Sequence, residues 1–260
     1  MTLRRVLIAL LLIYTLIIVY LNVAIGLSRS PSPLLTPLNT VIGFSFALLH
    51  ASDRFGWRRT LIFLGSAFVV SLALESLGVA TGWVYGPYHY SENKLGPLFL
   101  GLVPLLIPLA WFMMIYASFI LADWLTPTLT RVARPLVIAA VGGVIMTAWD
   151  LVVDPVMVQA GYWVWDVKGP YFGIPLQNYL GWWVTTALAL IVFQITAKLG
   201  DRPARSSASD RLALIFYVLT ALGEISGAWL MNLDGAALTG IFAMFTWVLL
   251  SWNKMAEGNR

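Results

Sequence analysis

Long apolar runs are the feature that most constrains how this chain can fold. Each run is close to the roughly 20 residues that an α-helix needs to cross about 30 Å of hydrocarbon. Eight runs can be traced, at about 6–27, 33–51, 60–81, 97–123, 135–153, 178–198, 211–231 and 236–253. The sequence therefore predicts an all-α, polytopic transmembrane helical bundle of about eight spans. The second and last runs are short, so seven spans also fit.

Composition agrees with a membrane protein. Of the 260 residues, 60% are hydrophobic and 11% are charged, whereas a soluble domain has about a quarter charged residues. The first run follows Arg4 and Arg5, but it is longer than the apolar region of a signal peptide and no clear cleavage site follows, so we expect a retained span. Absent cysteines exclude thiolate metal sites, and two histidines argue against a histidine-rich di-iron oxygenase. No metal site and no cofactor is predicted.

The basic residues predict the orientation in the membrane, because Lys and Arg are retained on the cytoplasmic side. With eight spans, one side receives thirteen of the 16 basic residues: Arg4, Arg5, Arg54, Arg58, Arg59, Arg131, Arg134, Lys198, Arg202, Arg205, Arg211, Lys254 and Arg260. The other side receives Arg29, Lys94 and Lys168. We therefore expect both termini to be cytoplasmic in a multi-pass protein of the cell membrane. The net charge of +4 then reflects topology and anionic headgroups rather than a nucleic-acid partner.

Residues 1–260 are expected to form one integral-membrane domain, because no stretch has the composition of a linker. The two faces of the membrane nevertheless differ. The cytoplasmic loops are short and basic, while two outer segments, Thr81–Pro97 and Asp154–Trp183, are rich in aromatic residues, glycine and proline. An interfacial aromatic belt would have the same composition. If the chain carries out chemistry, we expect it in the outer half.

Four carboxyl groups are predicted in that outer half: Glu75, Asp150, Asp154 and Glu224. An ionisable group inside a span costs roughly 2.5–3.5 kcal/mol and usually faces a cavity or a partner. Asp123 and His50 belong instead to the cytoplasmic ends of their spans. We expect a structural role for both, with Arg131 and Arg134 close to Asp123.

Asp150 and Asp154 are the candidate catalytic pair. Residues four apart lie on one face of a helix, so the two carboxyl groups share one cavity, and Pro155 is expected to end or kink the helix directly after them. Two close carboxyl groups resist double ionisation, which leaves a protonated acid beside an anion at neutral pH. The sequence thus predicts a proton donor in an apolar site.

Aromatic residues are expected around this pair. Trp149 directly precedes Asp150, and the two outer segments contribute Trp83, Tyr85, Tyr88, Tyr90, Tyr162, Trp163, Trp165, Tyr171, Tyr179 and Trp182. Aromatic faces attract a desolvated cation by about 2 kcal/mol or more. An acid beside such a cage suits protonation of an alkene to a carbocation. The same residues would also hold a hydrophobic ligand without reaction.

Several ordered motifs resemble the family of carotenoid biosynthesis membrane proteins, which includes bisanhydrobacterioruberin hydratase and γ-carotene hydratase. The motifs are ESLGVATGWVYGPYHY (Glu75–Tyr90), LGPLFLGLVPLLIPLAWFMM (Leu95–Met114), AWDLVVDPVM (Ala148–Met157), GYWVWD (Gly161–Asp166) and YFGIPLQNYLGWW (Tyr171–Trp183). The resemblance covers roughly residues 65–200. It implies cofactor-independent addition of water to the terminal isopropylidene double bond of an acyclic carotenoid, giving a tertiary alcohol.

Chemistry then suggests roles for individual residues. The protonated member of the Asp150/Asp154 pair donates to the alkene, and Glu75 or the remaining aspartate accepts the proton of the attacking water. Tyr88, His89, Asn178 and Tyr179 are candidates for holding that water. Asp166 and Glu224 complete the predicted substrate-binding set. The oligomeric state is left open.

A transporter or a lipid- or carotenoid-binding protein is the rival interpretation, with the four carboxyl groups as a proton relay. Another carotenoid-modifying activity, such as a cyclase or an isomerase, also fits the resemblance. Alternating access requires a polar route on both sides, whereas the cytoplasmic halves of the spans are apolar apart from Asp123 and His50. The sequence therefore favours the enzyme.

Overall fold

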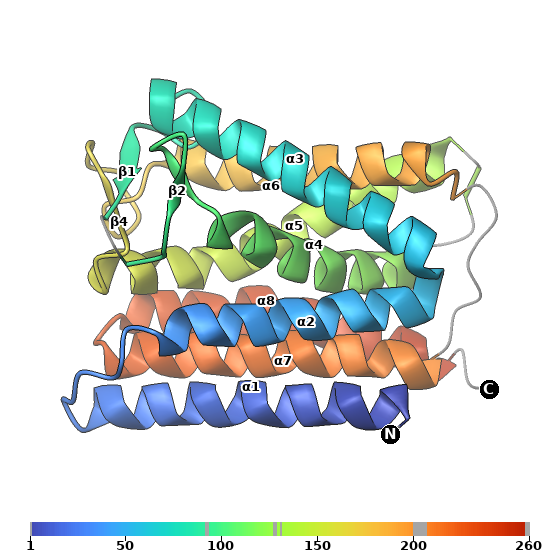
Figure 1. Ribbon diagram of the computed structural model, residues 1–260, viewed down its shortest axis with the longest axis horizontal. Helices are drawn as coiled ribbons and strands as arrows, with labels where there is room; N and C mark the ends of the chain where they lie inside the picture. The colour runs from blue at the N-terminus through green and yellow to red at the C-terminus, as the bar shows by residue number, and fades with distance from the viewer. Residues whose placement is uncertain (1, 92–93, 127–128, 131, 200–206, 258–260) are drawn as a thin grey trace.

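Eight α-helices run side by side in the computed structural model, which describes residues 2–91, 94–126, 129–130, 132–199 and 207–257 (Figure 1). They are α1 (Leu3–Gly26), α2 (Leu35–Phe55), α3 (Trp57–Thr81), α4 (Leu106–Leu125), α5 (Ala133–Gln159), α6 (Leu176–Thr196), α7 (Ser207–Leu230) and α8 (Asp234–Glu257). The predicted all-α bundle is confirmed.

Seven of the eight described helices are long and apolar enough to cross a membrane, and α2 is the exception. The C-terminal half of α2 carries His50, Asp53 and Arg54, which makes it more polar than the others. It still packs along α1 and α4 within the bundle (Figure 1). The last helix, α8, is among the seven, so α2 is the uncertain span that the sequence indicated.

Helix α4 lies in the middle of the bundle and contacts α2, α3, α5, α7 and α8. In its most apolar stretch 78% of the residues are buried, compared with 17% in α1, which packs on α2 and α7 at one side of the bundle. Small residues bring other helices together. A Cβ atom on Gly142 of α5 would lie 2.6 Å from Leu190 of α6, closer than side chains normally approach. The core is therefore closed around α4, while α1 faces outward.

Two small antiparallel sheets lie at one end of the bundle, which we call the sheet end (Figure 1). Strand β1 (Tyr88–Tyr90) pairs with β4 (Trp163–Trp165), and β2 (Leu98–Phe99) pairs with β3 (Val103–Pro104). These strands were not predicted from the sequence. The fourth span was predicted to begin at residue 97, but the β2–β3 hairpin occupies residues 98–104 and α4 starts at Leu106. The short strands satisfy backbone groups outside the helices.

Both chain termini lie at the other end, which we call the terminal end (Figure 1). The start of α1 and the end of α8 thus share one end of the bundle. Which side is cytoplasmic stays a prediction. Of the basic residues behind that prediction, Arg131, Arg202, Arg205 and Arg260 lie outside the described residues, as does most of the loop from Gly200 to Arg211.

A buried polar cluster joins helices at the terminal end. Asp123 of α4 binds Arg134 and lies 3.4 Å from Arg54 of α2, which also pairs with Asp210 of α7 at 2.9 Å. His50 accepts from the Tyr116 hydroxyl group at 2.5 Å and donates to a backbone carbonyl of α7 at 2.9 Å. The predicted contact between Asp123 and Arg134 is confirmed, and both Asp123 and His50 have helix-joining contacts. The buried carboxyl group of Asp210 was missed, because the sequence analysis placed it at the edge of a loop.

Candidate active site

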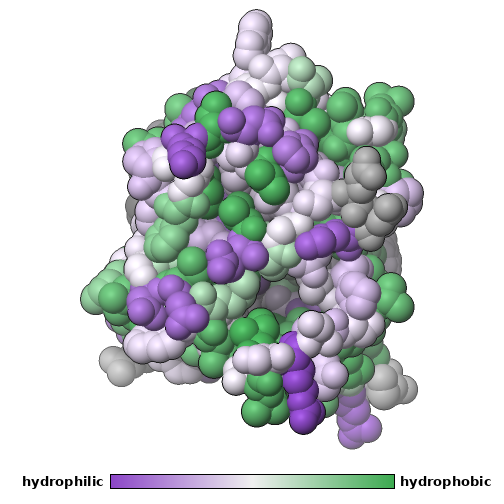
Figure 2. All heavy atoms as spheres, turned by 90° about the vertical axis from the view of Figure 1, so that its left-hand side faces the viewer, coloured by the Kyte–Doolittle hydropathy of each residue, from purple (hydrophilic) through white to green (hydrophobic). Residues whose placement is uncertain are grey.

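A cavity of about 630 Å³ lies in the half of the bundle nearest the sheet end. Helices α1 to α7 all contribute side chains to its wall, together with residues of β1 and β4. Seen from the sheet end, the surface mixes hydrophilic and hydrophobic residues around a recess near its centre (Figure 2). Most of the residues proposed from the sequence meet at this cavity.

Asp150 and Asp154 lie on one face of α5, as the i, i+4 spacing predicts. Both are buried, with 0% and 1% of their surfaces exposed. The side-chain amide of Asn178, on α6, donates to Asp150 at 3.0 Å and to Asp154 at 2.5 Å. Only Asp154 lines the cavity. Asn178, which also lines the cavity, therefore orders the pair, with Asp154 as the member that faces a ligand.

An end or a kink was expected at Pro155, and α5 does not end there but continues to Gln159. Proline has no N–H, which deprives the carbonyl of Leu151 of its helical donor. The Tyr171 hydroxyl group donates to that carbonyl at 2.9 Å. Tyr171 thus supports the backbone between Asp150 and Asp154, although it does not line the cavity.

Glu75, in the part of α3 nearest the sheet end, is held by three donors. The hydroxyl groups of Tyr88 and Tyr90 donate to Oε2, Tyr90 at 2.8 Å, and the indole N–H of Trp111 donates to Oε1 at 2.8 Å. Burial and the nearby Glu75 carboxyl group raise the pKa of Tyr88 and of Tyr90 well above the ordinary value, so both remain donors. Three of the roughly four acceptor positions of Glu75 are thus occupied. Its carboxyl group is fixed at the cavity wall.

The β1–β4 pair places four aromatic rings on one face. Tyr88 is opposite Trp165 and Tyr90 is opposite Trp163, with ring centroids 5.5 and 6.0 Å apart. Side chains alternate along a strand, so His89 points the other way. All four rings line the cavity, whereas His89 forms a pair at 2.9 Å with Asp166 on the exposed face.

Tyr85 fills a slot between α3 and α6. A Cβ atom on Gly78 or on Gly181 would lie 2.6 Å from the Tyr85 ring, so only glycine leaves room at these two positions. The Tyr85 hydroxyl group lies 2.7 Å from the hydroxyl group of Thr185. Tyr85 therefore lines the cavity from a fixed position.

Three tryptophans form another wall. Trp182 of α6 lies against Trp111 of α4 and Trp149 of α5, with ring centroids 4.3 and 5.6 Å apart. The Trp149 indole N–H is buried and has no partner among the described residues. Trp111 was missed from the sequence, because a tryptophan inside a fully apolar run has no pattern that separates a site residue from a core residue.

Other predicted residues lie outside the cavity. Trp83 is 78% exposed, and the exposed pair of His89 and Asp166 has already been placed on the outer face. Tyr179 of α6 packs against Tyr171, with ring centroids 5.6 Å apart, and its buried hydroxyl group has no partner in the described part of the chain. Neither tyrosine belongs to the cavity wall.

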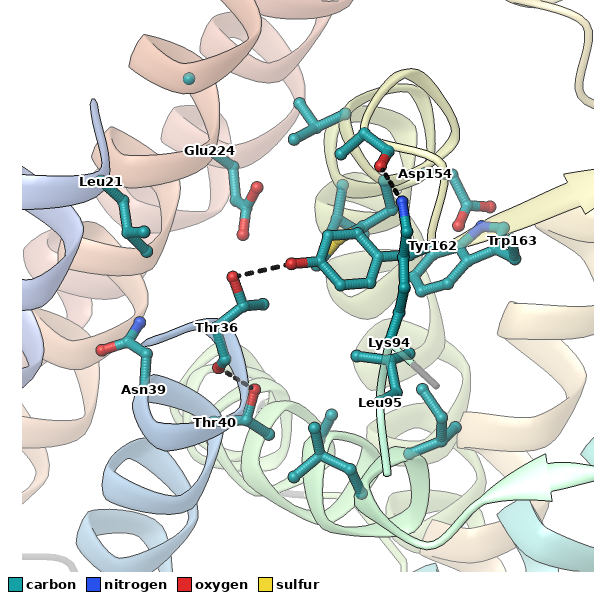
Figure 3. A pocket seen from close by; sticks show the side chains of 18 of the residues that line it. Leu21, Thr36, Asn39, Thr40, Lys94, Leu95, Asp154, Tyr162, Trp163 and Glu224 are labelled. Atoms are coloured by element: carbon teal, nitrogen blue, oxygen red, sulfur yellow. Dashed lines mark hydrogen bonds between the residues drawn. The ribbon is translucent and has the colours of Figure 1, made fainter. Parts of the chain in front are cut away.

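Glu224 reaches the cavity from α7, on the side away from Asp154 (Figure 3). The same side carries polar residues that the sequence analysis did not select: Asn22 of α1 and Thr36, Asn39 and Thr40 of α2. Tyr162, which that analysis counted with the aromatic residues, donates to the Thr36 hydroxyl group at 3.1 Å. The sequence offered one indication of these four residues, which is that they are polar and lie in or beside apolar runs.

Comparison with known proteins identifies the family of the chain that forms this cavity. Residues 35–250 match the family described as carotenoid biosynthesis protein. The chain belongs to the carotenoid biosynthesis protein family. This carotenoid biosynthesis protein is also 31% identical, over 136 residues, to a protein of Haloarcula japonica named bisanhydrobacterioruberin hydratase. That alignment covers 52% of the chain and 45% of the relative, so the match spans less than half of the relative's length. No solved structure matches the chain.

Family membership gives the cavity a chemical context. The chain has seven helices that could span a membrane, among the residues that the structure describes. The residues that line its aromatic cavity lie within the matched part, except those of α1 and of the segment between α1 and α2. A role in carotenoid biosynthesis follows from the family.

Proposed function

We propose that the chain is a carotenoid hydratase. It adds water across the terminal isopropylidene double bond of an acyclic carotenoid and gives a tertiary alcohol, without a cofactor. The observation that carries the proposal is the buried Asp150/Asp154 pair, which faces an aromatic cavity through Asp154. The match to a hydratase of Haloarcula japonica supports the same reaction.

Asp154 donates the proton in this mechanism. Its proton forms a bond to the less substituted alkene carbon, the π electrons of the double bond form that C–H bond, and the other carbon becomes a tertiary cation. Asp150 does not line the cavity, so it acts as a positioning residue together with Asn178. A positioned general acid contributes typically 10²- to 10⁴-fold to a rate. Water then forms the C–O bond and loses a proton to a carboxylate.

The wall of the cavity stabilises the cation. The faces of Trp149, Trp163 and Trp182 attract positive charge that exists only after protonation, so their effect is on the transition state rather than on substrate binding. Glu75, as a carboxylate fixed by three donors, adds a negative charge at the same wall. The cavity also limits bulk water, which protects the cation from side reactions.

The substrate reaches the cavity from the lipid beside α1. A carotenoid chain is about as long as the roughly 30 Å hydrocarbon layer, whereas the cavity occupies one half of the bundle, so the rest of the polyene must lie outside it. An apolar groove of about 510 Å³ between α1 and α7 shares Ile18, Asn22 and Gly223 with the cavity wall. This groove is the proposed path for the polyene.

Both termini are proposed to be cytoplasmic, with the cavity in the outer half of the cell membrane. The support is the distribution of basic residues, most of which belong to the terminal end. The rival transport function would need a polar route to that end. The described polar cluster there, Arg54, Asp210, His50 and Tyr116, is engaged in ion pairs and hydrogen bonds, and none of these four residues lines the cavity.

The test is expression in a lycopene-producing host, followed by mass analysis of the pigments. A hydratase adds the mass of one water per modified end, and Asp154→Asn removes the product while the protein stays in the membrane. Pigment of unchanged mass in a changed distribution would instead support a transporter or a binding protein. A changed mass without added water would indicate another carotenoid-modifying activity.

A further inference from the structure

The polar side of the cavity has no role in the mechanism so far. It consists of Asn22, Thr36, Asn39, Thr40 and Glu224, from α1, α2 and α7. Figure 3 shows the Glu224 carboxyl group and the Thr36 side chain reaching into the cavity, with Asp154 on its other side. Polar residues in a bilayer are costly and usually functional, so this side requires an explanation.

Glu224 differs from the other three carboxyl groups of the cavity region. Asp150 and Asp154 accept from Asn178, and Glu75 accepts from three donors. For Glu224, no hydrogen bond or ion pair with another described residue is found. Buried polar groups are almost always hydrogen-bonded, so a carboxyl group that faces a cavity without a protein partner is suited to bind water or a ligand.

Neighbouring groups have hydrogen-bonding capacity for the same water. The Thr36 hydroxyl group accepts from Tyr162 at 3.1 Å and, within the described part of the chain, donates to no acceptor. The side-chain oxygen of Asn39 is buried and has no partner among the described residues. A bound water needs two to four polar partners, and the Glu224 carboxyl group and the Thr36 hydroxyl group, which both reach into the cavity, supply two of them.

We propose that Glu224 binds the water that is added to the carotenoid and accepts its proton. The inference rests on the proposed hydratase function and assigns a second half-reaction within the same cavity. A lone pair of the water oxygen forms the C–O bond to the tertiary cation, and one O–H bond breaks as its proton passes to the Glu224 carboxylate. Asp154 has by then become a carboxylate, and a proton returns to it from Glu224 through water before the next turnover.

This division of labour separates protonation from water addition. Without Glu224, the cation still forms from Asp154 and returns to an alkene by losing a proton to the same aspartate. In D₂O the proton donor carries deuterium, so each such return leaves deuterium in part of the recovered carotenoid. Loss of Glu224 should therefore block hydration without blocking deuterium exchange.

The experiment uses the full chain in membranes, with lycopene as the substrate, in D₂O. Glu224→Gln should lower hydration at least about tenfold, as expected for loss of an acid–base group, while deuterium accumulates in unhydrated lycopene. Asp154→Asn should abolish both. Glu224→Asp, which keeps a carboxylate, should retain part of the hydration and guards against a folding defect in Glu224→Gln. Trp229→Phe, on the same helix but 57% exposed and outside both the cavity wall and the groove, is the matched control and should hydrate normally.

Two results would overturn the role of Glu224. The first is hydration at the wild-type rate in Glu224→Gln. The second is loss of both hydration and deuterium exchange in both Glu224 variants while their unfolding midpoints match that of the wild type. Failure of the wild-type chain to hydrate lycopene or another acyclic carotenoid would overturn the proposed function instead. The two failures are therefore distinguishable.

Discussion

Tyr171→Phe tests whether a hydroxyl group replaces the helical hydrogen bond that Pro155 removes from α5. The Tyr171 hydroxyl group donates to the Leu151 carbonyl at 2.9 Å, and water is scarce at this depth as a substitute. Side-chain hydrogen bonds inside membrane proteins contribute about 0.6 kcal/mol on average and up to about 1.7 kcal/mol. Because Leu151 would keep no other donor for this carbonyl, we expect a loss near the upper part of that range, about 1–1.5 kcal/mol in the free energy of unfolding.

The assay is equilibrium unfolding of the purified protein in mixed micelles by titration with SDS. Tyr179→Phe is the matched control, because its ring contacts Tyr171 but its hydroxyl group has no partner among the described residues. We expect that control to be neutral or slightly stabilised. Equal changes in the two variants would refute the role of Tyr171, as would an unchanged Tyr171→Phe. The Tyr171 variant should also hydrate more slowly, since the backbone between Asp150 and Asp154 loses its support.

Three further predictions address the cavity and the topology. Trp149→Phe should slow single-turnover hydration at saturating carotenoid by several-fold with little change in binding, because cation–π attraction develops only with the charge. Trp83→Phe, at a 78% exposed position, should leave the rate unchanged. Equal rates in the two variants would assign Trp149 to packing. Tyr90→Phe removes a donor to the buried carboxyl group of Glu75 and should lower the free energy of unfolding by about 1.5–3 kcal/mol in SDS titration. The control Tyr20→Phe, on the exposed side of α1, should leave it unchanged. An unchanged unfolding midpoint for Tyr90→Phe would contradict the Glu75 contact. In the cysteine-free chain, single cysteines at Lys168 and Lys254 should react with an impermeant reagent from opposite sides of the membrane, and reaction from the same side would contradict the proposed topology.

Much of the site was predictable because helix geometry is regular. The spacing of Asp150 and Asp154 places both carboxyl groups on one face, and the structure adds Asn178 as their shared donor. The apolar runs predicted the helices, but some ends were wrong by up to nine residues, as at the start of α4, where a strand pair precedes the helix. Local pattern was sufficient for these features.

Other features depend on pairing between distant segments, which a single sequence does not specify. Tyr88 and Tyr90 face the cavity while His89 faces outward because β1 pairs with β4, and these three-residue strands have no sequence signal of their own. Trp111 reaches Glu75 from an apolar helix, where nothing distinguishes it from a packing residue. The ion pair between Arg54 and Asp210 likewise joins two helices that are far apart in sequence.

The central claim, that Asp154 donates the proton, is tested most directly by single-turnover hydration of lycopene in membranes that contain wild-type chain or Asp154→Asn. The substitution keeps the size of the side chain and removes the acid. We predict a rate at least about tenfold lower than wild type, with an unchanged amount of folded protein in the membrane. Hydration by Asp154→Asn at the wild-type rate would contradict the mechanism.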